Sequence, residues 1–489
     1  MDYVARLGVP RHVYIDGRRV DDVRREPALA GAFRCIQEYY RQQTDDAACH
    51  LHTDEQGRSY ATSLLVPRTK EDLERKRRSY EAVAELSFGM IGRSPDFMNA
   101  ALCSIAAHAN LLGTGRHADY AANARAYFER CRGENLFIGH ATINPQLDRS
   151  KSLGSLGKAC DGVRLVAMNA DGITVEGAKM IATLAPLVDE LVFFNMPGLT
   201  ASESPYALAF TLPVATTGLH VFCRKSFFRP DRSHEDQPLS NRFDEIDAYI
   251  VLERVFVPWR DVFVCEDVER SNVFFGDTLA RSHSGHQGIV RGLVKAKLMT
   301  GTAIRIARAI GLDARPEVQQ ALGELTTSLE LVRAAVLLAE NDARLSPQGV
   351  MTPSIQAIDA CRYHFPNWYE RMARSLRSLA PGSMLANLPY AALTGSPPID
   401  LQTALGTSRI DADERVRLLS LAWDLCGSDF AMRHIAYEYT HAGDPGRIAS
   451  AHYRSYATEQ FEQIVGRAIG RDAFPQLARN FMAEVQQKF

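Results

Sequence analysis

The sequence predicts a mainly α-helical protein with a central β region, because the hydrophobic periodicity changes twice along the chain. Apolar residues recur at helical spacing in the first and last parts, and they alternate with polar residues in between. The chain has 489 residues, more than a single hydrophobic core usually organises. We therefore expect a mostly helical domain over 1–138, a β-barrel domain over 139–268 and a helical bundle over 269–489.

The first part shows three helix signals. A short β-prone stretch precedes a predicted helix over 29–43. A second helix is predicted from Thr69, because Glu71 and Asp72 place negative charge in its first turn, where the helix dipole favours it. The Ser-Pro-Asp sequence at 94–96 predicts a third helix, with the serine as N-cap and the proline in the first helical position.

The middle part carries strand patterns. An Asp-Gly pair at 171–172 predicts a hairpin turn between two alternating segments. Segments of strand length, rich in aromatic and β-branched residues, come next at 206–213, 219–223 and 249–257. This pattern favours a barrel or a sandwich.

Long helical patterns return in the last part. They cover approximately 286–311, 316–343, 353–379 and 413–440, and Gly or Pro interrupts the chain after each of the first three. Four such helices predict a bundle.

Composition excludes several functional classes. Lys and Arg number 56 and Asp and Glu 58, so the net charge is −2 and no overall basic field attracts nucleic acid or anionic lipid. The nine cysteines are scattered and form no C-x-x-C pair, which is typical of reduced thiols and argues against local zinc or iron–sulfur sites. Neither an apolar signal core at the N-terminus nor an 18-residue apolar run is present. We expect a cytoplasmic protein that binds neither nucleic acid nor membrane.

Common nucleotide and hydrolase motifs are absent. The sequence contains no G-x-G-x-x-G, no G-x-x-x-x-G-K-[ST], no H-E-x-x-H and no G-x-S-x-G. Neither a Rossmann site nor a P-loop is therefore predicted. His283 and His286 have no nearby carboxylate or cysteine companion in the sequence, so we predict no metal site there.

Two residues stand out on physical grounds. Arg93 places a cation beside the positive end of the helix predicted at 94–96, which is unfavourable unless an anion balances it. That anion is either a surface carboxylate or a bound anionic ligand such as a phenolate. His140 lies at the change from helical to strand pattern, where pockets between domains commonly form, although an interface histidine with satisfied hydrogen bonds explains it equally well. These observations alone indicate an enzyme-like protein with a cleft.

Several stretches taken together resemble the 4-hydroxyphenylacetate 3-hydroxylase family. They occur in the family's order and span nearly the whole chain, at residues 18–23, 92–97, 139–149, 176–183, 243–247, 257–259, 286–287 and 442–445. The resemblance implies an acyl-CoA dehydrogenase-like fold, with a helical N-terminal domain, a β-barrel and a C-terminal four-helix bundle. It also implies a homotetramer or homodimer.

The resemblance further implies the oxygenase component of a two-component flavin monooxygenase. Such a protein receives reduced FAD (FADH2) from a separate NAD(P)H-flavin reductase and uses molecular oxygen to hydroxylate a small phenol ortho to its hydroxyl. The oxygenating species is a flavin C4a-hydroperoxide, which needs a pocket closed to water. The absence of a nicotinamide fingerprint agrees with this division of labour.

The same resemblance implies a set of site residues. Arg93 and His140 match residues around the phenolic oxygen, and His286 faces the substrate or the flavin. Phe97 occupies the position where the family has a tyrosine, so one hydroxyl donor is missing. The residues expected to contact the flavin are Gln146, Arg149, Thr183, Asp244 and, from a neighbouring subunit, Arg433.

Three alternatives stay open. A biosynthetic flavin oxygenase acting on a modified tyrosine, a bicyclic phenol or a carrier-bound aromatic would fit the change at Phe97. A flavin-dependent acyl-CoA dehydrogenase or dehydratase is more remote, because Cys103 has no cysteine partner nearby in the sequence. The glutamates that could serve a dehydrogenase are interpreted as ordinary helix surface, and they are Glu324, Glu330 and Glu340. A flavin-free interaction protein is the third alternative.

Overall fold

The computed structural model covers most of the chain, and the residues that it describes are 2–148, 150–155, 161–395 and 399–469. The chain forms two compact units, Met1–Gly443 and Asp444–Phe489. The second unit contributes two described helices, α17 (Pro445–Ser455) and α18 (Glu459–Ala468). Every residue with a predicted role lies in the described part of the first unit except Arg149, which is outside the described residues.

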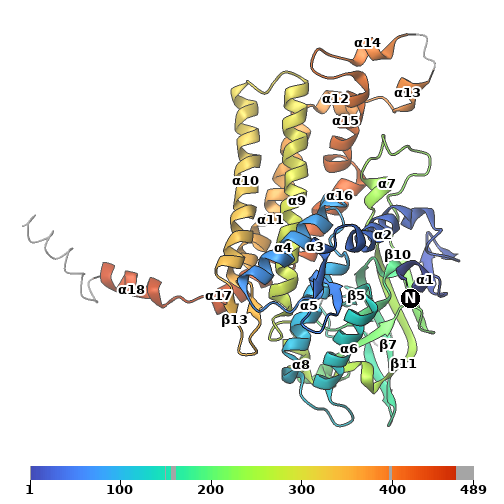
Figure 1. The fold of residues 1–489 in the computed structure, drawn as a ribbon, viewed down its shortest axis with the longest axis vertical. Coiled ribbons are helices and arrows are strands. Elements are labelled where there is room, and N and C mark those ends of the chain that lie inside the picture. Colours follow the sequence, from blue (N-terminus) through green and yellow to red (C-terminus); the bar gives the residue numbers. More distant parts are fainter. Residues whose placement is uncertain (1, 149, 156–160, 396–398, 470–489) are drawn as a thin grey trace, which may run out of the picture. The chain divides into compact units, whose positions relative to one another are not determined.

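Of the longer helices of the N-terminal part, three were predicted from the sequence and one, α6 (Tyr120–Glu134), was not (Figure 1). Its longer helices are α2 (Ala30–Asp45), α4 (Lys70–Glu85), α5 (Pro95–Ala107) and α6 (Tyr120–Glu134). Thr69 and Asp72 form a reciprocal capping box at the start of α4. Ser94 occupies the N-cap position of α5, but its hydroxyl donates to Asp96 Oδ1 at 2.5 Å instead of accepting a backbone N–H. The N-cap position was therefore predicted correctly and its hydrogen bond was not.

Two sheets form the β region (Figure 1). The larger has the order β2-β1-β10-β11-β7-β6, and its strands are β1 (His12–Ile15), β2 (Arg18–Val20), β6 (Arg164–Met168), β7 (Gly172–Thr183), β10 (Leu219–Cys223) and β11 (Asp247–Pro258). The smaller has the order β12-β9-β8-β5, and its strands are β5 (Ile138–Ala141), β8 (Glu190–Phe193), β9 (Leu208–Pro213) and β12 (Val262–Cys265).

The larger sheet includes two strands from the start of the chain, β1 and β2. β1 pairs in parallel with β10, with His12 opposite His220, and antiparallel with β2. Burial of Val13, Ile15 and Val20 explains this placement, because these side chains complete the apolar face of the sheet. The β region therefore extends beyond the predicted range of 139–268.

The helical part contains three long helices that lie side by side in Figure 1. These are α9 (Ala280–Ala309), α10 (Pro316–Asn341) and α11 (Ile355–Leu379). The single helix predicted over 413–440 is wrong, because the structure has α15 (Ala412–Cys426) and α16 (Asp429–His441).

The break between α15 and α16 has a local cause. The hydroxyl of Ser428 accepts the N–H of Ala431 and so starts a new helix. A Cβ at Gly427 would lie 2.5 Å from the ring of Trp423, so a larger residue at this bend would require that ring to move.

The remaining elements are short. Two-stranded ribbons are formed by β3 (Leu51–Thr53) with β4 (Ser59–Ala61) and by β13 (Arg344–Leu345) with β14 (Met351–Thr352). The short α-helices are α1 (Tyr3–Arg6), α3 (Ala47–His50), α7 (Ser240–Phe243), α8 (Val268–Val273), α12 (Pro381–Leu385), α13 (Ala391–Thr394) and α14 (Leu401–Leu405).

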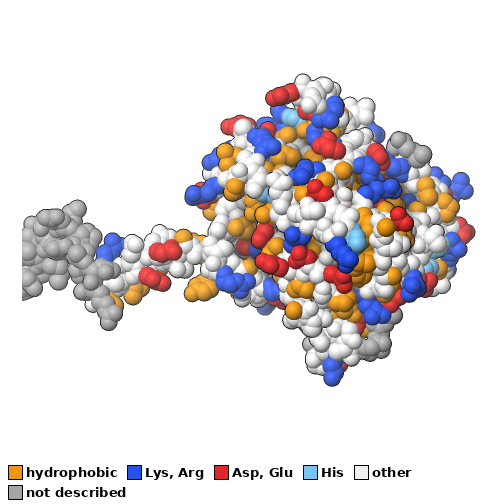
Figure 2. All heavy atoms as spheres, turned by 90° about the horizontal axis from the view of Figure 1, so that it is seen from below, with side chains coloured by type: hydrophobic (Ala, Val, Ile, Leu, Met, Phe, Trp, Pro, Cys, Tyr) orange, Lys and Arg blue, Asp and Glu red, His pale blue; other side chains and the backbone are white. Residues whose placement is uncertain are grey.

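The surface agrees with the balanced composition. On the face shown in Figure 2, Lys and Arg side chains are interspersed with Asp and Glu side chains. No helix in the described part of the chain is long and apolar enough to cross a membrane.

The site is positioned by α5. This helix packs against α9 of the helical part and against β5 of the smaller sheet. The loop before α5 and the end of β5 are thereby brought together.

Candidate active site

Arg93, Phe97 and His140 lie together where α5 meets β5. The guanidinium carbon of Arg93 is 3.9 Å from the centroid of the Phe97 ring. That ring centroid is 5.4 Å from the centroid of the His140 imidazole. The three residues predicted to surround the acceptor are thus neighbours, although 47 positions separate Arg93 from His140 in the chain (140 − 93 = 47).

Arg93 is held by the protein without a countercharge. The backbone N–H groups of Gly92 and Arg93 donate to Glu245 Oε1 at 2.7 and 2.6 Å. The guanidinium donates to Tyr437 Oη at 3.1 Å and to the carbonyl oxygen of His441 at 3.0 Å. Among the described residues, no carboxylate oxygen lies within ion-pair distance of this guanidinium, and its buried Nε has no hydrogen-bond partner. The surface salt bridge that the sequence left open is therefore not formed.

His140 presents an uncharged and unbonded imidazole. Burial, then the positive charge of Arg93 and the nearby His441, hold its pKa well below the usual value. No described residue donates a hydrogen bond to either ring nitrogen or accepts one from it. A neutral imidazole beside a cation can exchange hydrogen bonds with a polar ligand, which a satisfied interface histidine could not do.

A chain of hydrogen bonds runs from Asp247 to a residue that the sequence did not indicate, His441. Thr183 at the end of β7 donates its hydroxyl to Asp247 Oδ1 at 2.8 Å. His441 Nε2 lies 2.9 Å from Thr183 Oγ1, and the imidazole stacks on Tyr437 with the ring centroids 3.9 Å apart. The spacing of Arg433, Tyr437 and His441, four residues apart along α16, was the available signal, since such residues share one helix face.

Arg433 and Asp244 belong to a cluster of buried charges behind His441, here called the acid–arginine cluster. It consists of Arg224, Asp244, Glu245, Asp247 and Arg433. Arg433 contacts Glu245 Oε2 at 3.0 Å and Asp247 Oδ2 at 2.9 Å. Arg224 contacts Asp244 Oδ1 at 2.6 Å and Asp247 Oδ2 at 3.3 Å. Burial raises the pKa of Asp247. The positive charges of Arg433 and Arg224 and the hydrogen bond with His441 outweigh this effect and hold the pKa well below its usual value.

The predicted flavin contacts of Asp244 and Arg433 stay predictions. Both oxygens of Asp244 are engaged, because Oδ2 also accepts from Ser226 Oγ and from the N–H of Phe227. Arg433 donates to the carboxylates of Glu245 and Asp247.

His286 lies in a separate buried contact inside the helical part. Its Nε2 is 3.0 Å from Glu340 Oε1, and Arg77 pairs with the same carboxylate at 2.9 Å. Glu340 was predicted as helix surface, and this is wrong, because the residue is only 8% exposed. Glu324 and Glu330 are exposed as predicted. The neighbouring Gln287 donates to Asp96 Oδ2 at 3.2 Å, so α9 contacts the first turn of α5 through Gln287.

Gln146 lies on the exposed segment that comes after β5. This segment runs beside β7, because the N–H of Met180 donates to the carbonyl oxygen of Ile143 at 2.8 Å. Gln146 and Thr183 are therefore on adjacent segments.

Lys179 on β7 holds the segment that contains Gln146 in place by hydrogen bonds. Its buried ammonium donates to Asn144 Oδ1 at 2.7 Å, to Asn195 Oδ1 at 2.8 Å and to the carbonyl oxygens of Thr142 and Phe194. All four acceptors are uncharged, and burial lowers the pKa of the ammonium to about 7. One side chain thus joins the chain segments that come after β5 and β8.

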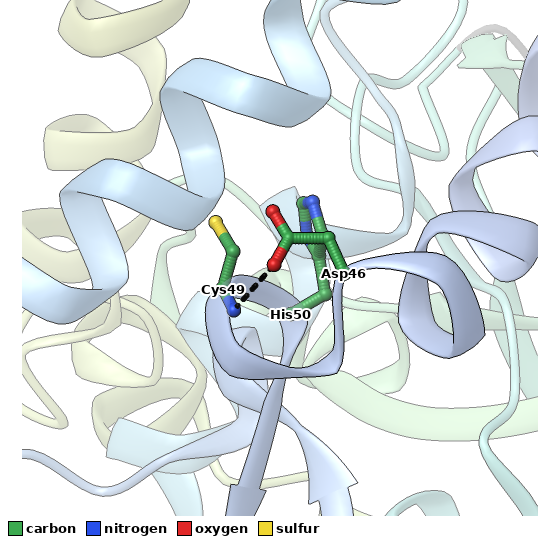
Figure 3. Close-up of side chains that lie close together, drawn as sticks. All are labelled: Asp46, Cys49 and His50. Atoms are coloured by element: carbon green, nitrogen blue, oxygen red, sulfur yellow. Dashed lines mark hydrogen bonds between the residues drawn. The ribbon is translucent and has the colours of Figure 1, made fainter.

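Two other features lie away from this site. Asp46, Cys49 and His50 have ligand-type atoms within 4.8 Å of one another, but Asp46 Oδ1 caps the turn by accepting the N–H of Cys49 (Figure 3). Burial raises the pKa of the Cys49 thiol, which disfavours the thiolate that a metal would need. A cavity of about 590 Å³ is lined by Arg409, Arg415 and the segment 379–383, among others.

Comparison with known proteins identifies the chain's relatives. The family model "4-hydroxyphenylacetate 3-hydroxylase N terminal" matches residues 1–264, and the corresponding C-terminal model matches 271–470. The 4-hydroxyphenylacetate 3-monooxygenase oxygenase component of Geobacillus sp. is 34% identical over 95% of this chain and 94% of its own length. The pyoverdin chromophore biosynthetic protein PvcC of Pseudomonas aeruginosa is 30% identical over 91% of this chain and 89% of its own.

A solved structure extends the comparison to the fold. The oxygenase component HpaB of 4-hydroxyphenylacetate 3-monooxygenase, in complex with FAD and 4-hydroxyphenylacetate, superposes with a TM-score of 0.90. It is 32% identical, and the match covers 100% of this chain and 98% of that one.

Proposed function

The chain belongs to the 4-hydroxyphenylacetate 3-hydroxylase family of oxygenase components, and on this premise we propose that it hydroxylates a phenolic acceptor ortho to its hydroxyl, with the phenolic oxygen held between Arg93 and His140. As a member, it is a flavin-dependent aromatic hydroxylase. The position of the acceptor and the identity of the acceptor are the parts that the proposal adds.

The observation that carries the proposal is the buried Nε of Arg93, which has no hydrogen-bond partner, on a guanidinium that pairs with no carboxylate in the described part of the chain. A buried donor without a partner costs free energy, and a phenolic or phenolate oxygen would satisfy it. Negative charge on that oxygen also raises the nucleophilicity of the ring carbon beside it, which an electrophilic oxygen donor requires. The neutral His140 completes the polar side of the pocket.

The residues at the site suit reduced FAD as the redox group. Gln146 offers an exposed carboxamide that can pair with a carbonyl or an N–H group of a flavin ring. Thr183 lies on the adjacent segment, and its Oγ1, whose hydrogen goes to Asp247, can still accept from a flavin N–H. When bound, reduced FAD supplies the electrons that activate molecular oxygen. The chain's own residues hold the acceptor, and the ring of Phe97 covers one face of Arg93 and limits access of water.

A separate NAD(P)H-flavin reductase is the proposed source of reduced FAD. The description of the Geobacillus relative as an oxygenase component supports this division, as does the absence of a G-x-G-x-x-G motif in the sequence. We propose a homotetramer or homodimer, as the family resemblance implies.

The proposed acceptor is larger than 4-hydroxyphenylacetate. Phe97 gives the pocket an apolar wall where the resemblance leads us to expect a tyrosine hydroxyl. A modified tyrosine, a bicyclic phenol or a carrier-bound aromatic would rely less on that hydroxyl. The biosynthetic role in the name of the PvcC relative supports such an acceptor.

Oxygen uptake tests the proposed function. The purified chain should consume oxygen when a reductase or a chemical reductant supplies reduced FAD, and NADH alone should have no effect. A panel of phenols, monitored by product mass and by hydrogen peroxide release, should reveal acceptors that gain one oxygen atom. Rapid NADH oxidation without a reductase, or failure of every phenol to gain oxygen, would contradict the proposal.

A further inference from the structure

We propose that His441 is the base that removes the proton from the phenolic hydroxyl, and that Asp247 supports it through the hydroxyl of Thr183. This inference rests on the proposed function and assigns the proton-transfer step within it. His140 then serves as a neutral hydrogen-bonding partner of the acceptor.

The hydrogen bonds determine which nitrogen of His441 carries a proton. Asp247 is ionised and can only accept, so the hydroxyl of Thr183 donates its one hydrogen to Asp247 Oδ1 at 2.8 Å. Thr183 Oγ1 must therefore accept from His441 Nε2, 2.9 Å away. With the proton on Nε2, the Nδ1 of the neutral ring carries a lone pair.

Nδ1 of His441 is the group left to act on a ligand. It is buried and has no hydrogen-bond partner in the described part of the chain. Arg93, which donates to the carbonyl oxygen of the same residue, has a buried Nε that is also unpartnered. A phenolic hydroxyl needs one acceptor for its hydrogen and one donor for its oxygen, and these two atoms supply them.

His140 and His441 differ in what would stabilise a proton on them. The charged and titratable groups around His441 come from several elements, and they are Arg93, His140, Asp247, Arg433 and Tyr437. The pKa of His441 is below its usual value, because burial, Arg93 and Arg433 together lower it by more than Asp247 raises it. Burial, Arg93 and His441 all lower the pKa of His140, and no carboxylate opposes them. Only His441 has a carboxylate to stabilise its imidazolium.

The transfer balances in atoms and charge. The O–H bond of the phenol breaks, the proton forms a bond with His441 Nδ1, and the electron pair stays on the phenolic oxygen. The phenolate then faces the guanidinium of Arg93. The imidazolium is connected to Asp247 through Thr183 and by the direct contact of Nε2 with Asp247 Oδ1 at 3.5 Å. The acid–arginine cluster behind it holds two guanidinium groups and three carboxylates, so it favours the added positive charge.

Binding of 4-nitrophenol tests this assignment without turnover, because its phenolate and its neutral form absorb at different wavelengths. The full chain is loaded with oxidised FAD at a pH below the pKa of the free probe. We expect the parent protein to bind the probe as phenolate. His441→Gln should bind it as the neutral phenol, since glutamine can still reach Thr183 but offers no base in place of Nδ1.

Further variants separate His441 from its neighbours. His140→Gln should weaken binding but keep the phenolate spectrum. Thr183→Val removes the hydroxyl that bridges His441 to Asp247 and leaves only their direct contact at 3.5 Å. It should lower the ratio of phenolate to phenol about tenfold, the effect of losing a hydrogen bond to a charged group. His364→Gln, at an exposed position of α11, is the matched control and should behave as the parent. Should His441→Gln fail to fold, His441→Asn serves the same comparison.

The outcomes are distinct. A phenolate spectrum that is lost in His140→Gln and kept in His441→Gln would overturn the assignment, as would binding of the neutral phenol by the parent. In both cases the phenol still binds, so the proposed function would survive. If the parent bound no phenol of the acceptor panel, the proposed function would fail together with this inference.

Discussion

Arg93 lies directly over the ring of Phe97, with its guanidinium carbon 3.9 Å from the ring centroid. A cation in this position is attracted to the face of the ring by about 0.5–2 kcal/mol. Phe97 therefore orients Arg93 even though it donates no hydrogen bond.

Phe97→Tyr should improve the use of simple para-substituted phenols. The tyrosine keeps the ring beneath Arg93 and adds one hydroxyl donor, worth about 0.5–1.5 kcal/mol, or about two- to tenfold in affinity. The measurement is the KM for 4-hydroxyphenylacetate relative to that for the native acceptor. Phe97→Leu, which removes the ring, is the control and should weaken both acceptors. Unchanged relative values in Phe97→Tyr would remove this residue from the account of specificity.

Arg93→Ala should uncouple oxygen use from hydroxylation. The side chain is only partly buried, so the fold should persist, but the acceptor loses the cation that faces its oxygen. Loss of such a preorganised donor costs on the order of 100-fold in rate. The test is the ratio of hydroxylated product to hydrogen peroxide. Arg25→Ala, at a side chain that is 88% exposed, should leave this ratio unchanged. Full product yield from Arg93→Ala would contradict the phenolate model.

Asp96→Asn should change how stability depends on pH. Burial raises the pKa of Asp96 from 3.8 to about 6, despite hydrogen bonds from Ser94 and Gln287. The folded protein therefore binds this proton more tightly than the unfolded chain. The contribution to the free energy of unfolding is complete below pH 4 and is lost as the pH rises through 6, by up to about 3 kcal/mol.

Urea unfolding from pH 4 to pH 7 measures this effect. The free energy of unfolding of Asp96→Asn, relative to that of the parent, should increase over this range because asparagine does not titrate. Asp231→Asn, at an exposed side chain, should show a constant difference. A constant difference for Asp96→Asn as well would mean that Asp96 titrates normally.

Lys179→Met should remove a rise in stability at alkaline pH. Burial lowers the pKa of Lys179 from 10.5 to about 7. Between these values the unfolded chain binds a proton that the folded protein does not, so the free energy of unfolding of the parent rises, by up to about 3 kcal/mol between pH 7 and 9. The Met variant should lack this rise in urea unfolding, and Lys225→Met, at an exposed position, should keep it.

The same variant should also affect the site. Loss of the ammonium leaves Asn144 and Asn195 without their donor and releases the segment that comes after His140. Peroxide release per oxygen consumed should therefore rise. If Lys179→Met released no more peroxide per oxygen consumed than the parent, the hydrogen bonds of Lys179 would have no role in catalysis.

Helix periodicity predicted most of the fold. The helices α2, α4, α9, α10 and α11 each bury one face, so the 3.6-residue pattern locates them within a few residues. The strands β5 and β8 were missed, because they have only four residues each and β8 is buried at every position, which leaves no alternation to detect.

The candidate site was predicted unevenly for a related reason. Arg93 places a positive charge at a helix N-terminus, where negative charge is preferred, so the sequence alone marks it as a candidate site residue. His441 conflicts with no such local preference, so no local signal in the sequence marks it. Its partners Thr183 and Asp247 come from β7 and β11, and only the tertiary structure reveals that they meet.

The parallel pairing of β1 with β10 has a consequence for folding. His12 and its partner His220 are 208 residues apart (220 − 12 = 208), so the pair closes a very long loop. At a synthesis rate of about 5–20 residues per second, β1 waits roughly 10 to 40 s for its partner. During that time the apolar side chains of Val13 and Ile15 are exposed, and a chaperone that shields the nascent N-terminal segment should increase the yield of native protein.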